Sequence, residues 1–282
     1  LVAADFKTSK YFVNDGGSPR LGFTDATVAS GCGLDENGMG SALGDIDNDG
    51  LLDWYVTSIY QAPPATGNTG NKLYVNQGNH TYQEVAKAAG VDDGRWGWGT
   101  VMADVDLDAW LDILATGGWF VPPWIFNPSF VWMNDGDGTF TESAAAMGFL
   151  HYQSGRGMAN LDYDNDGDQD FLIASNQGRL ALYRTDQGSS TNGWLRVFLD
   201  TSGKRDLAPN GLGSYVRLTT ASGTQTRYVA ADAHFLGISE TSAHFGLGQD
   251  TTILSLTVEW ADGGTTTLNS VTPNQTMTIA AP

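Results

Sequence analysis

A short acidic segment occurs three times in this chain and constrains its fold more than any other feature. The first copy, at residues 45–53, reads Asp-Ile-Asp-Asn-Asp-Gly-Leu-Leu-Asp, and related copies lie at residues 104–112 and 162–170. Each copy has carboxylates at its positions 1, 3, 5 and 9. Because like charges this close repel one another, a folded chain keeps them together only with a cation among them. Flexible loops with several oxygen ligands favour Ca²⁺ over Mg²⁺.

The loops differ from an EF-hand, which begins in the same way. An EF-hand loop has twelve residues and ends in a bidentate glutamate. Position 12 is Val56, Ala115 or Ile173 in the three copies, so each loop must close at its ninth residue instead. The residues that follow are short β-branched, aromatic and aliphatic runs, which predict strands rather than helices. We therefore expect a tight ligand-bearing turn that leads into a strand; the alternative is an acidic surface turn without a metal.

The sixth residue of each loop lies where the chain turns sharply, and we expect it to have a positive φ angle. Gly50 and Gly167 suit this position, because glycine reaches positive φ without a steric cost. The middle copy has Ala109 there, which costs about 1 kcal/mol in a left-handed conformation. The middle loop is therefore expected to be the weakest or most distorted of the three.

The composition is strongly acidic, with 32 Asp and Glu against 14 Lys and Arg and a formal charge of −18. The three loops hold 13 of these acids. Three bound Ca²⁺ ions would offset six of the 18 negative charges and leave −12. The remaining field repels phosphate, which argues against nucleic acid or anionic lipid as a partner.

Other features of the composition favour an extracellular location, either secreted or at the cell surface. No run of 18 apolar residues occurs, so no membrane span is expected. Cys32 is the single cysteine, which rules out an intrachain disulfide. The chain begins at Leu1 without Met, which indicates a removed signal peptide or a fragment of a longer protein. Weak calcium loops, with dissociation constants of about 10⁻⁴–10⁻³ M, fill in extracellular fluid.

The acidic loops belong to a longer repeat, because they are spaced 59 and then 58 residues apart. A hairpin with an Asn-containing turn precedes each loop, and a strand of small residues leads directly into it. Small residues suit an inner strand where neighbouring strands converge. The hairpins lie at residues 11–25, 73–84 and 131–142, the small-residue strands at 40–44, 99–103 and 157–161, and Ala-rich pieces long enough for one helical turn at 85–89 and 143–147.

Residues 10–185 resemble the FG-GAP/VCBS repeat, the blade unit of integrin-α-like β-propellers. Loop, hairpin and period all agree with that family, in which Ca²⁺ bound within one blade has a structural role. The resemblance implies about three Ca²⁺ ions, bound by side chains at positions 1, 3, 5 and 9 of each loop and by the carbonyl at position 7. These residues are Asp45, Asp47, Asp49, Leu51 and Asp53; Asp104, Asp106, Asp108, Trp110 and Asp112; and Asp162, Asp164, Asp166, Asp168 and Asp170.

Residues 192–282 resemble the ASPIC/UnbV domain, which follows FG-GAP repeats in secreted acidic proteins. The resemblance rests on Trp-Leu-Arg-Val-Phe-Leu at 194–199, Asn-Gly-Leu-Gly-Ser-Tyr at 210–215, His-Phe-Gly-Leu-Gly at 244–248 and Val-Glu-Trp-Ala-Asp-Gly-Gly at 258–264. Alternating strands are expected at 215–219, 225–230, 254–260, 265–268 and 277–280. The predicted organisation is therefore all-β, with propeller-like repeats over residues 1–188 and a β-sandwich or barrel over residues 189–282.

Three blades are too few to close a propeller ring, which usually has about four to eight. The array is thus expected to be incomplete or small, and something must cover its open edges. Three arrangements are compatible with the sequence. The chain is a fragment, the C-terminal domain packs against the open end, or a neighbouring subunit supplies the missing strand through residues 1–10. The last would produce an oligomer or an open-ended filament.

No motif for catalysis is present. The four histidines (His80, His151, His234 and His244) lack zinc spacing, and for His244 we expect a role in structuring a turn. There is no nucleophile elbow, dinucleotide-binding fingerprint or P-loop. The expected function is an extracellular calcium-binding protein for structure or adhesion that acts by protein binding or self-assembly, with no enzyme activity. The competing class is a protein that binds or cleaves carbohydrate on a calcium-stabilised propeller.

Aromatic residues gather between positions 96 and 132, in part on a Pro-rich segment at 117–129 that predicts an irregular loop. Three interpretations of these residues remain open: packing between blades or domains, a surface for a protein partner, and a glycan contact through ring stacking. The residues are Trp96, Trp98, Trp119, Phe120, Trp124, Phe126, Phe130 and Trp132.

Overall fold

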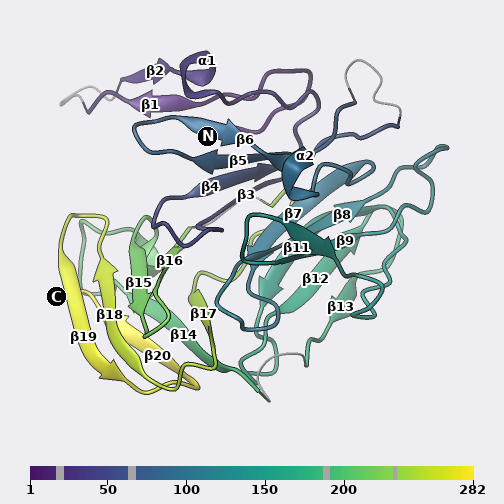
Figure 1. The fold of residues 1–282 in the computed structure, drawn as a ribbon. Helices are drawn as coiled ribbons and strands as arrows, with labels where there is room; N and C mark the ends of the chain where they lie inside the picture. The colour runs from purple at the N-terminus through teal and green to yellow at the C-terminus, as the bar shows by residue number, and fades with distance from the viewer. Residues whose placement is uncertain (17–21, 63–67, 187–190, 231–233) are drawn as a thin grey trace.

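A computed structural model of the chain describes residues 1–16, 22–62, 68–186, 191–230 and 234–282. Its regular secondary structure is almost entirely short strands. Figure 1 shows the N-terminal sheets (purple to teal) following one another as a fan, with the C-terminal sheets (green to yellow) beside the inner strands of that fan. The predicted fold class is confirmed: a propeller-like array of small sheets precedes a β-sandwich.

The N-terminal sheets are antiparallel, and each is built from strands that are consecutive in the sequence. Three of them carry an acidic loop between their first and second strands. The strands are β1 (Phe12–Asn14) and β2 (Phe23–Asp25); β3 (Ser41–Gly44), β4 (Asp53–Val56), β5 (Lys72–Asn76) and β6 (Tyr82–Glu84); β7 (Gly97–Ala103), β8 (Asp112–Gly117), β9 (Phe130–Asn134) and β10 (Phe140–Glu142); and β11 (Gly155–Leu161), β12 (Asp170–Ser175) and β13 (Ala181–Tyr183).

The first strands of these sheets converge, which explains their small residues. A Cβ atom on Gly40 would lie 2.1 Å from the carbonyl oxygen of Trp98, and one on Gly99 would lie 2.3 Å from that of Arg156. A larger side chain at either position would push the neighbouring backbone away. The expectation of a crowded inner strand is confirmed.

Separate apolar cores join successive sheets face to face. Tyr55 and Leu73 pack with Ile113 and Trp132 between β3–β6 and β7–β10. A second core joins β7–β10 to β11–β13, and a third joins the N-terminal segment to β3–β6. This face-to-face packing of neighbouring sheets is the packing of propeller blades. The single-turn helices α1 (Thr27–Ser30) and α2 (Ala86–Ala89) each end at a left-handed glycine.

The C-terminal third forms two sheets that enclose their own core, which includes Leu195, Val216, Phe245 and Leu256. Its expected strands are present, and a 3₁₀ turn, η1 (Pro209–Gly211), precedes β15. One sheet has the order β17 (Ala243–Gly248), β14 (Gly193–Asp200), β20 (Gln275–Ala280), and the other β16 (Thr224–Tyr228), β15 (Tyr215–Thr219), β18 (Ile253–Glu259), β19 (Thr265–Val271).

The C-terminal domain covers the inner edges of the blades. Its segment 234–240 runs along the first strands, where the N–H of Glu240 donates to the carbonyl of Asn160 at 3.2 Å and Phe235 packs 5.2 Å from Trp98. The C-terminal domain therefore packs against the inner side of the array, and not against its open end as one of the three expected arrangements had it. In the described part of the chain, no helix is long and apolar enough to cross a bilayer.

Candidate metal centre and domain interface

The three acidic loops share one hydrogen-bond scheme. The first carboxylate of each loop accepts the backbone N–H of the sixth residue, so it holds the turn closed. The distances are 3.1 Å from Gly50 N to Asp45 Oδ2, 3.0 Å from Ala109 N to Asp104 Oδ2 and 3.3 Å from Gly167 N to Asp162 Oδ2. The sixth residues have φ angles of 90°, 84° and 100°, so Ala109 adopts the left-handed conformation that the sequence predicted.

The ninth carboxylate closes each loop in the manner expected from the spacing. One of its oxygens accepts the N–H of the second loop residue, and the other accepts an N–H from the end of the adjacent third strand or from just after it. In the first loop, Asp53 accepts from Ile46 at 2.9 Å and from Asn76 at 2.8 Å. The equivalent pairs are Val105 and Asn134 on Asp112, and Tyr163 and Thr185 on Asp170.

Carboxylate oxygens converge within 4.8 Å in every loop. Positions 1, 3 and 9 meet in the first and third loops, whereas positions 1, 3 and 5 meet in the second. The fifth residues Asp49, Asp108 and Asp166 accept the N–H of the seventh residues Leu51, Trp110 and Asp168 at 2.8–3.0 Å. The middle loop thus differs from the other two, and the converging groups are Asp45, Asp47 and Asp53; Asp104, Asp106 and Asp108; and Asp162, Asp164 and Asp170.

In every loop a buried carboxylate oxygen lacks a hydrogen-bond partner, namely Oδ1 of Asp45, of Asp106 and of Asp162. Buried polar atoms in folded proteins nearly always have a partner, and an unpartnered one calls for a ligand or ion. Each of these oxygens converges with other carboxylate oxygens of its own loop, and together they form an all-oxygen donor set. Such a set fits a hard divalent cation.

Burial raises the pKa of the first and ninth carboxyl groups of each loop when only protein atoms surround them. It raises the pKa of Asp53 to about 8 and that of Asp104 to about 7, although Arg227 partly offsets the effect at Asp104. A charged carboxylate is therefore unfavourable in these turns unless a positive charge compensates it. A bound cation supplies that charge directly.

The second loop is also a docking site for the C-terminal domain. The N–H of Gly246, in β17, donates to Asp104 Oδ2 at 3.1 Å, and the N–H of Gly248 donates to the carbonyl of Leu107 at 2.8 Å. The side-chain amide of Asn192 donates to the carbonyl of Asp106 at 2.8 Å. One carboxylate of the acidic cluster thus holds both the loop and β17.

The third loop contacts the same domain through charged and aromatic side chains. Arg196 Nη1 lies 3.2 Å from Asp162 Oδ2 and 3.0 Å from Asn165 Oδ1, and the same guanidinium pairs with Glu240. His244 Nε2 donates to the carbonyl of Gly167 at 2.8 Å. This contact agrees with the turn-structuring role expected for His244. The first loop is held less closely, by Arg217 Nη1 at 3.5 Å from the carbonyl of Gly50.

No local pattern in the sequence marks Arg196 or Gly246 as part of this interface. Arg196 lies in β14, 34 residues from Asp162, and Gly246 is 142 residues from Asp104. Only a three-dimensional arrangement brings these residues to the loops.

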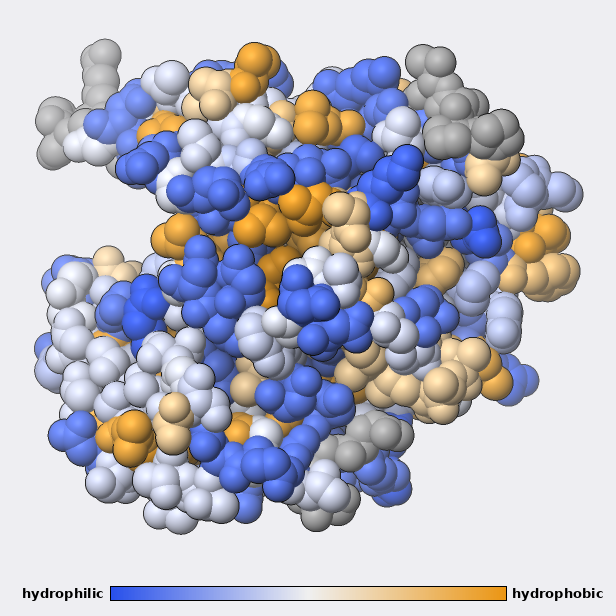
Figure 2. Space-filling view, in the orientation of Figure 1, coloured by the Kyte–Doolittle hydropathy of each residue, from blue (hydrophilic) through white to orange (hydrophobic). Residues whose placement is uncertain are grey.

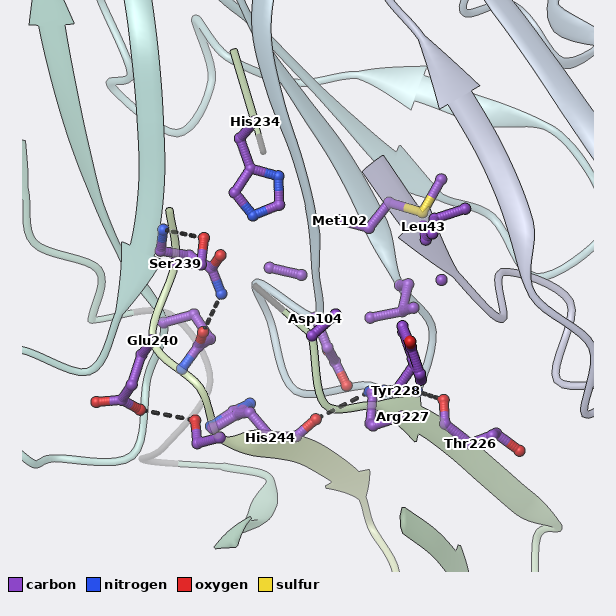
Figure 3. A pocket seen from close by; sticks show the side chains of 17 residues that line it. Leu43, Met102, Asp104, Thr226, Arg227, Tyr228, His234, Ser239, Glu240 and His244 are labelled. Carbon is purple, nitrogen blue, oxygen red and sulfur yellow. Dashed lines mark hydrogen bonds between the residues drawn. The ribbon is translucent and has the colours of Figure 1, made fainter. Parts of the chain in front are cut away.

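A polar cavity of about 90 Å³ lies between the inner strands and the C-terminal domain. Figure 3 shows His234, Ser239 and Glu240 on one side of it, with Leu43 and Met102 on the other. Asp104 lines the same space, so the cavity borders the second acidic loop. His234 and His244 are buried there, and burial lowers the pKa of each to about 4.

The aromatic residues between 96 and 132 pack largely on one another. Trp119 stacks on Trp96 at 5.0 Å and on Trp98 at 5.4 Å, and the guanidinium of Arg156 lies 3.8 Å from the Trp98 ring. Phe235 of the C-terminal domain completes the cluster. Packing between blades and against the C-terminal domain therefore accounts for its centre, and Phe130 and Trp132 lie in the core between two sheets. Phe120 and Phe126 remain exposed at the rim of the cluster.

Comparisons with known proteins agree with this architecture at the C-terminal end. Residues 204–282 match the family model "ASPIC and UnbV". The chain is 27% identical to cartilage acidic protein 1 of Mus musculus over 70% of its length and 38% of that protein. The Xenopus tropicalis protein is 27% identical, over 84% of this chain and 44% of its own length. The Homo sapiens protein is 24% identical, over 86% of this chain and 44% of its own length. The chain spans less than half the length of these relatives.

Among solved structures, the V. cholerae biofilm matrix protein Bap1 aligns with 95% of this chain and 47% of its own, at 11% identity and a TM-score of 0.33. That likeness is too low to support an argument. The fold and the family match together describe a propeller-like all-β protein whose residues 204–282 match the ASPIC and UnbV family model. The chain is a relative of cartilage acidic protein 1.

Proposed function

We propose that this chain is an extracellular structural protein whose acidic loops bind three Ca²⁺ ions, and that it acts by protein binding and self-association rather than by catalysis. The three loop-bearing sheets are, on this proposal, FG-GAP/VCBS repeats. The single observation that carries the proposal is the set of three equivalent turns, each with a buried carboxylate oxygen that lacks a donor.

The residues that would hold the ions are those that converge in each loop. The bound cation would supply positive charge to carboxylates that burial otherwise makes unfavourable. Since the second and third loops also bind the C-terminal domain, each ion would stabilise both a blade and the domain interface. Calcium would then have a structural role.

An extracellular site is supported by the loops and by the relatives. Loops that bind Ca²⁺ with dissociation constants near 10⁻³ M fill outside cells and stay empty in the cytosol. The relatives are named for cartilage, a tissue that is mostly extracellular matrix. A net charge of −18 keeps such a protein from binding nucleic acid.

Calcium removal tests the proposal. Titration calorimetry should give about three Ca²⁺ per chain, and EDTA should lower the melting temperature by about 10 °C or more, because ions that bind only the folded state stabilise it by mass action. Asp47→Asn and Asp164→Asn should each reproduce part of this loss. Asp206→Asn, at an exposed acid outside the loops, is the control and should melt like the parent. A melting curve that EDTA leaves unchanged refutes the metal assignment.

A second candidate, carbohydrate binding, is favoured by a groove of about 640 Å³ at the rim of the aromatic cluster. Four aromatic rings and several amides line it, and none of its described lining residues is acidic. Rings that stack on sugars and amides that bind hydroxyls form a suitable surface. The lining includes Trp119, Phe120, Phe126, Tyr152, Gln153, Asn176 and Gln177.

A glycan panel separates the two candidates. Binding that Phe126→Ala and Tyr152→Ala both weaken at least tenfold would establish the carbohydrate site. If the protein releases sugar from any member of the panel, and if one acid substitution outside the loops abolishes that release, the protein is an enzyme and the proposal of a non-catalytic role is wrong. Absence of binding across the panel leaves self-association as the function.

A further inference from the structure

The groove beside the aromatic cluster lies at the end of the sheets away from the acidic loops. The connection from β8 to β9, the segment that precedes β11 and the connection from β12 to β13 line it. Consecutive antiparallel strands turn at alternate ends of their sheet, so these connections lie opposite the acidic turns from β7 to β8 and from β11 to β12. An ion bound in one of those loops would therefore lie at the other end of the blade.

The parts of the chain that form this groove contain no acidic residue. Three stretches without Asp or Glu supply all of its described lining, although the chain has 32 acids. Their Lys and Arg residues are Arg156, Arg179 and Arg184, and Arg184 pairs with acids that do not line the groove. Charges more than about 10 Å apart are largely screened in physiological salt, so these arginines affect a ligand in the groove more than the net charge of −18 does. The stretches are residues 113–134, 143–161 and 171–185.

Arg179 presents an exposed guanidinium in the groove. In the described part of the chain, no carboxylate pairs with it. Its backbone N–H donates to Gln153 Oε1 at 3.0 Å, which anchors the turn that carries the side chain. A guanidinium offers a planar fork of N–H donors that fits the two oxygens of a carboxylate. Arg179 is therefore suited to bind a carboxylate of a ligand.

Arg156 supplies a second positive charge behind the wall of the groove. Its guanidinium lies 3.8 Å from the Trp98 ring and 5.0 Å from the Trp119 ring, and Nη1 donates to Ser154 Oγ at 2.9 Å. Trp119 and Ser154 line the groove. The Arg156 side chain is buried, and its Nη2 lacks a hydrogen-bond acceptor. Burial lowers the pKa of Arg156 to about 10, so it stays charged at neutral pH and attracts an anion across a poorly screened distance.

Exposed aromatic rings distinguish the groove from a purely charged surface. Phe126 is 75% exposed, Tyr152 49% and Phe120 39%. Flat rings of this kind stack on the apolar faces of sugar rings, and the amides beside them bind hydroxyl groups. A peptide of Asp and Glu would pair with the arginine but offers neither flat faces nor hydroxyls. The combination therefore favours a sugar that carries a carboxylate.

We propose that this groove binds an acidic polysaccharide built from uronic acids. Arg179 would hold a ring carboxylate, the exposed rings would stack on the sugar faces, and Arg156 would add positive charge from behind. The inference rests on the carbohydrate candidate of the proposed function and names the class of sugar that the groove takes.

Titration calorimetry on the calcium-loaded protein tests the proposal. The probes are tetramers of galacturonate, glucuronate and mannuronate, the same tetramers with their carboxylates reduced to alcohols, and tetraglutamate. At least one uronate tetramer should bind about tenfold more tightly than its reduced form and than tetraglutamate, because a charge-assisted bidentate pair is stronger than a neutral hydrogen bond. High salt should weaken binding of the acidic tetramer and leave the reduced one unchanged.

Matched variants assign the preference to the groove. Arg179→Gln should bind the uronate tetramer no more tightly than the reduced one, and it should melt like the parent because the side chain is exposed and unpaired among the described residues. Phe126→Ala should weaken binding of both tetramers. Arg205→Gln, which removes the same charge at an exposed site outside the groove, is the control and should bind like the parent.

The proposal is overturned if tetraglutamate binds as tightly as every uronate tetramer, or if Arg179→Gln binds the uronates like the parent. Equal binding of uronate and reduced tetramers rejects the preference for acids and leaves the carbohydrate site in place. Absence of binding by all tetramers rejects both. Calorimetry with Ca²⁺ alone reports on the loops, so failure of the metal sites is distinguished from failure of the groove.

Discussion

The sixth position of the acidic loops shows how one residue affects the stability of a turn. Gly50, Ala109 and Gly167 all have positive φ angles, yet only the glycines adopt them without strain. The surroundings of the two glycines differ. A Cβ on Gly167 would lie 2.1 Å from the Trp194 ring, whereas one on Gly50 would lie 3.1 Å from the flexible end of Arg217. The same substitution therefore has unequal consequences in equivalent turns.

The effects of substitutions at this position on the free energy of unfolding should reflect these differences in backbone strain and surroundings. Ala109→Gly is expected to stabilise the protein by about 1 kcal/mol and to tighten Ca²⁺ binding by the middle loop, because left-handed strain is removed. Gly50→Ala should cost about 1 kcal/mol, and Gly167→Ala more, since the Trp194 indole must also move. Urea unfolding of the three variants in calcium measures the order; equal costs at Gly50 and Gly167 would contradict the steric argument.

His234 is a second residue whose surroundings have a measurable effect. Burial lowers its pKa to about 4, so the folded protein holds it neutral while an unfolded chain takes up a proton near pH 6.5. Its contribution to stability is complete above about pH 6.5 and is lost as the pH falls toward 4. Relative to His234→Gln, the parent should lose about 2 kcal/mol between pH 7.5 and pH 5. A pH-independent difference in unfolding free energy would show that His234 is not buried as described.

At the scale of elements, the acidic loops connect blades to the C-terminal domain as well as strands to one another. Asp104 holds its own turn through Ala109 and holds β17 through Gly246. Asp162 likewise holds Gly167 and Arg196. The proposed ion binding and the domain docking thus involve the same carboxylates, and linkage requires that each change the other by the same factor.

Loss of a docking contact should therefore weaken ion binding in full-length protein. Arg196→Ala should lower the affinity of the third loop for Ca²⁺ about tenfold or less, and it should speed amide exchange in β14 and β17. Arg205→Ala, at an exposed arginine outside the interface, is the control. Tighter Ca²⁺ binding after Arg196→Ala would instead show that the guanidinium competes with the ion for Asp162.

At the scale of the whole molecule, the structure has two kinds of core. The sandwich encloses a single core of its own, whereas the propeller-like part is held by separate cores between successive sheets. Figure 2 shows a largely hydrophilic face on which apolar side chains gather over the β3–β6 sheet, at a hollow beside the C-terminal domain. The loop contacts are the polar connections between the two parts.

Calcium should accordingly determine whether the two parts of the chain unfold cooperatively. In millimolar Ca²⁺ we expect a single calorimetric transition, because the docked parts unfold together. In EDTA we expect two transitions, with the propeller-like part melting first, since its cores are smaller and its loop carboxylates are uncompensated. The test is scanning calorimetry in the two buffers. A single transition in both would mean that the domain interface does not depend on the loops.

The sequence by itself determined the local architecture of this protein. The three loops, their closure at the ninth residue, the left-handed sixth position and the strands on either side follow from residue spacing, because turn geometry depends on neighbours within about ten residues. Only the tertiary structure determined which residues of the C-terminal domain contact the loops. Arg196 reaches Asp162 and Gly246 reaches Asp104 across long stretches of chain, and among the described residues β13 has a neighbour on one side only, whereas β5 and β9 have one on both. Contacts of that kind depend on how whole sheets pack, which no local spacing encodes.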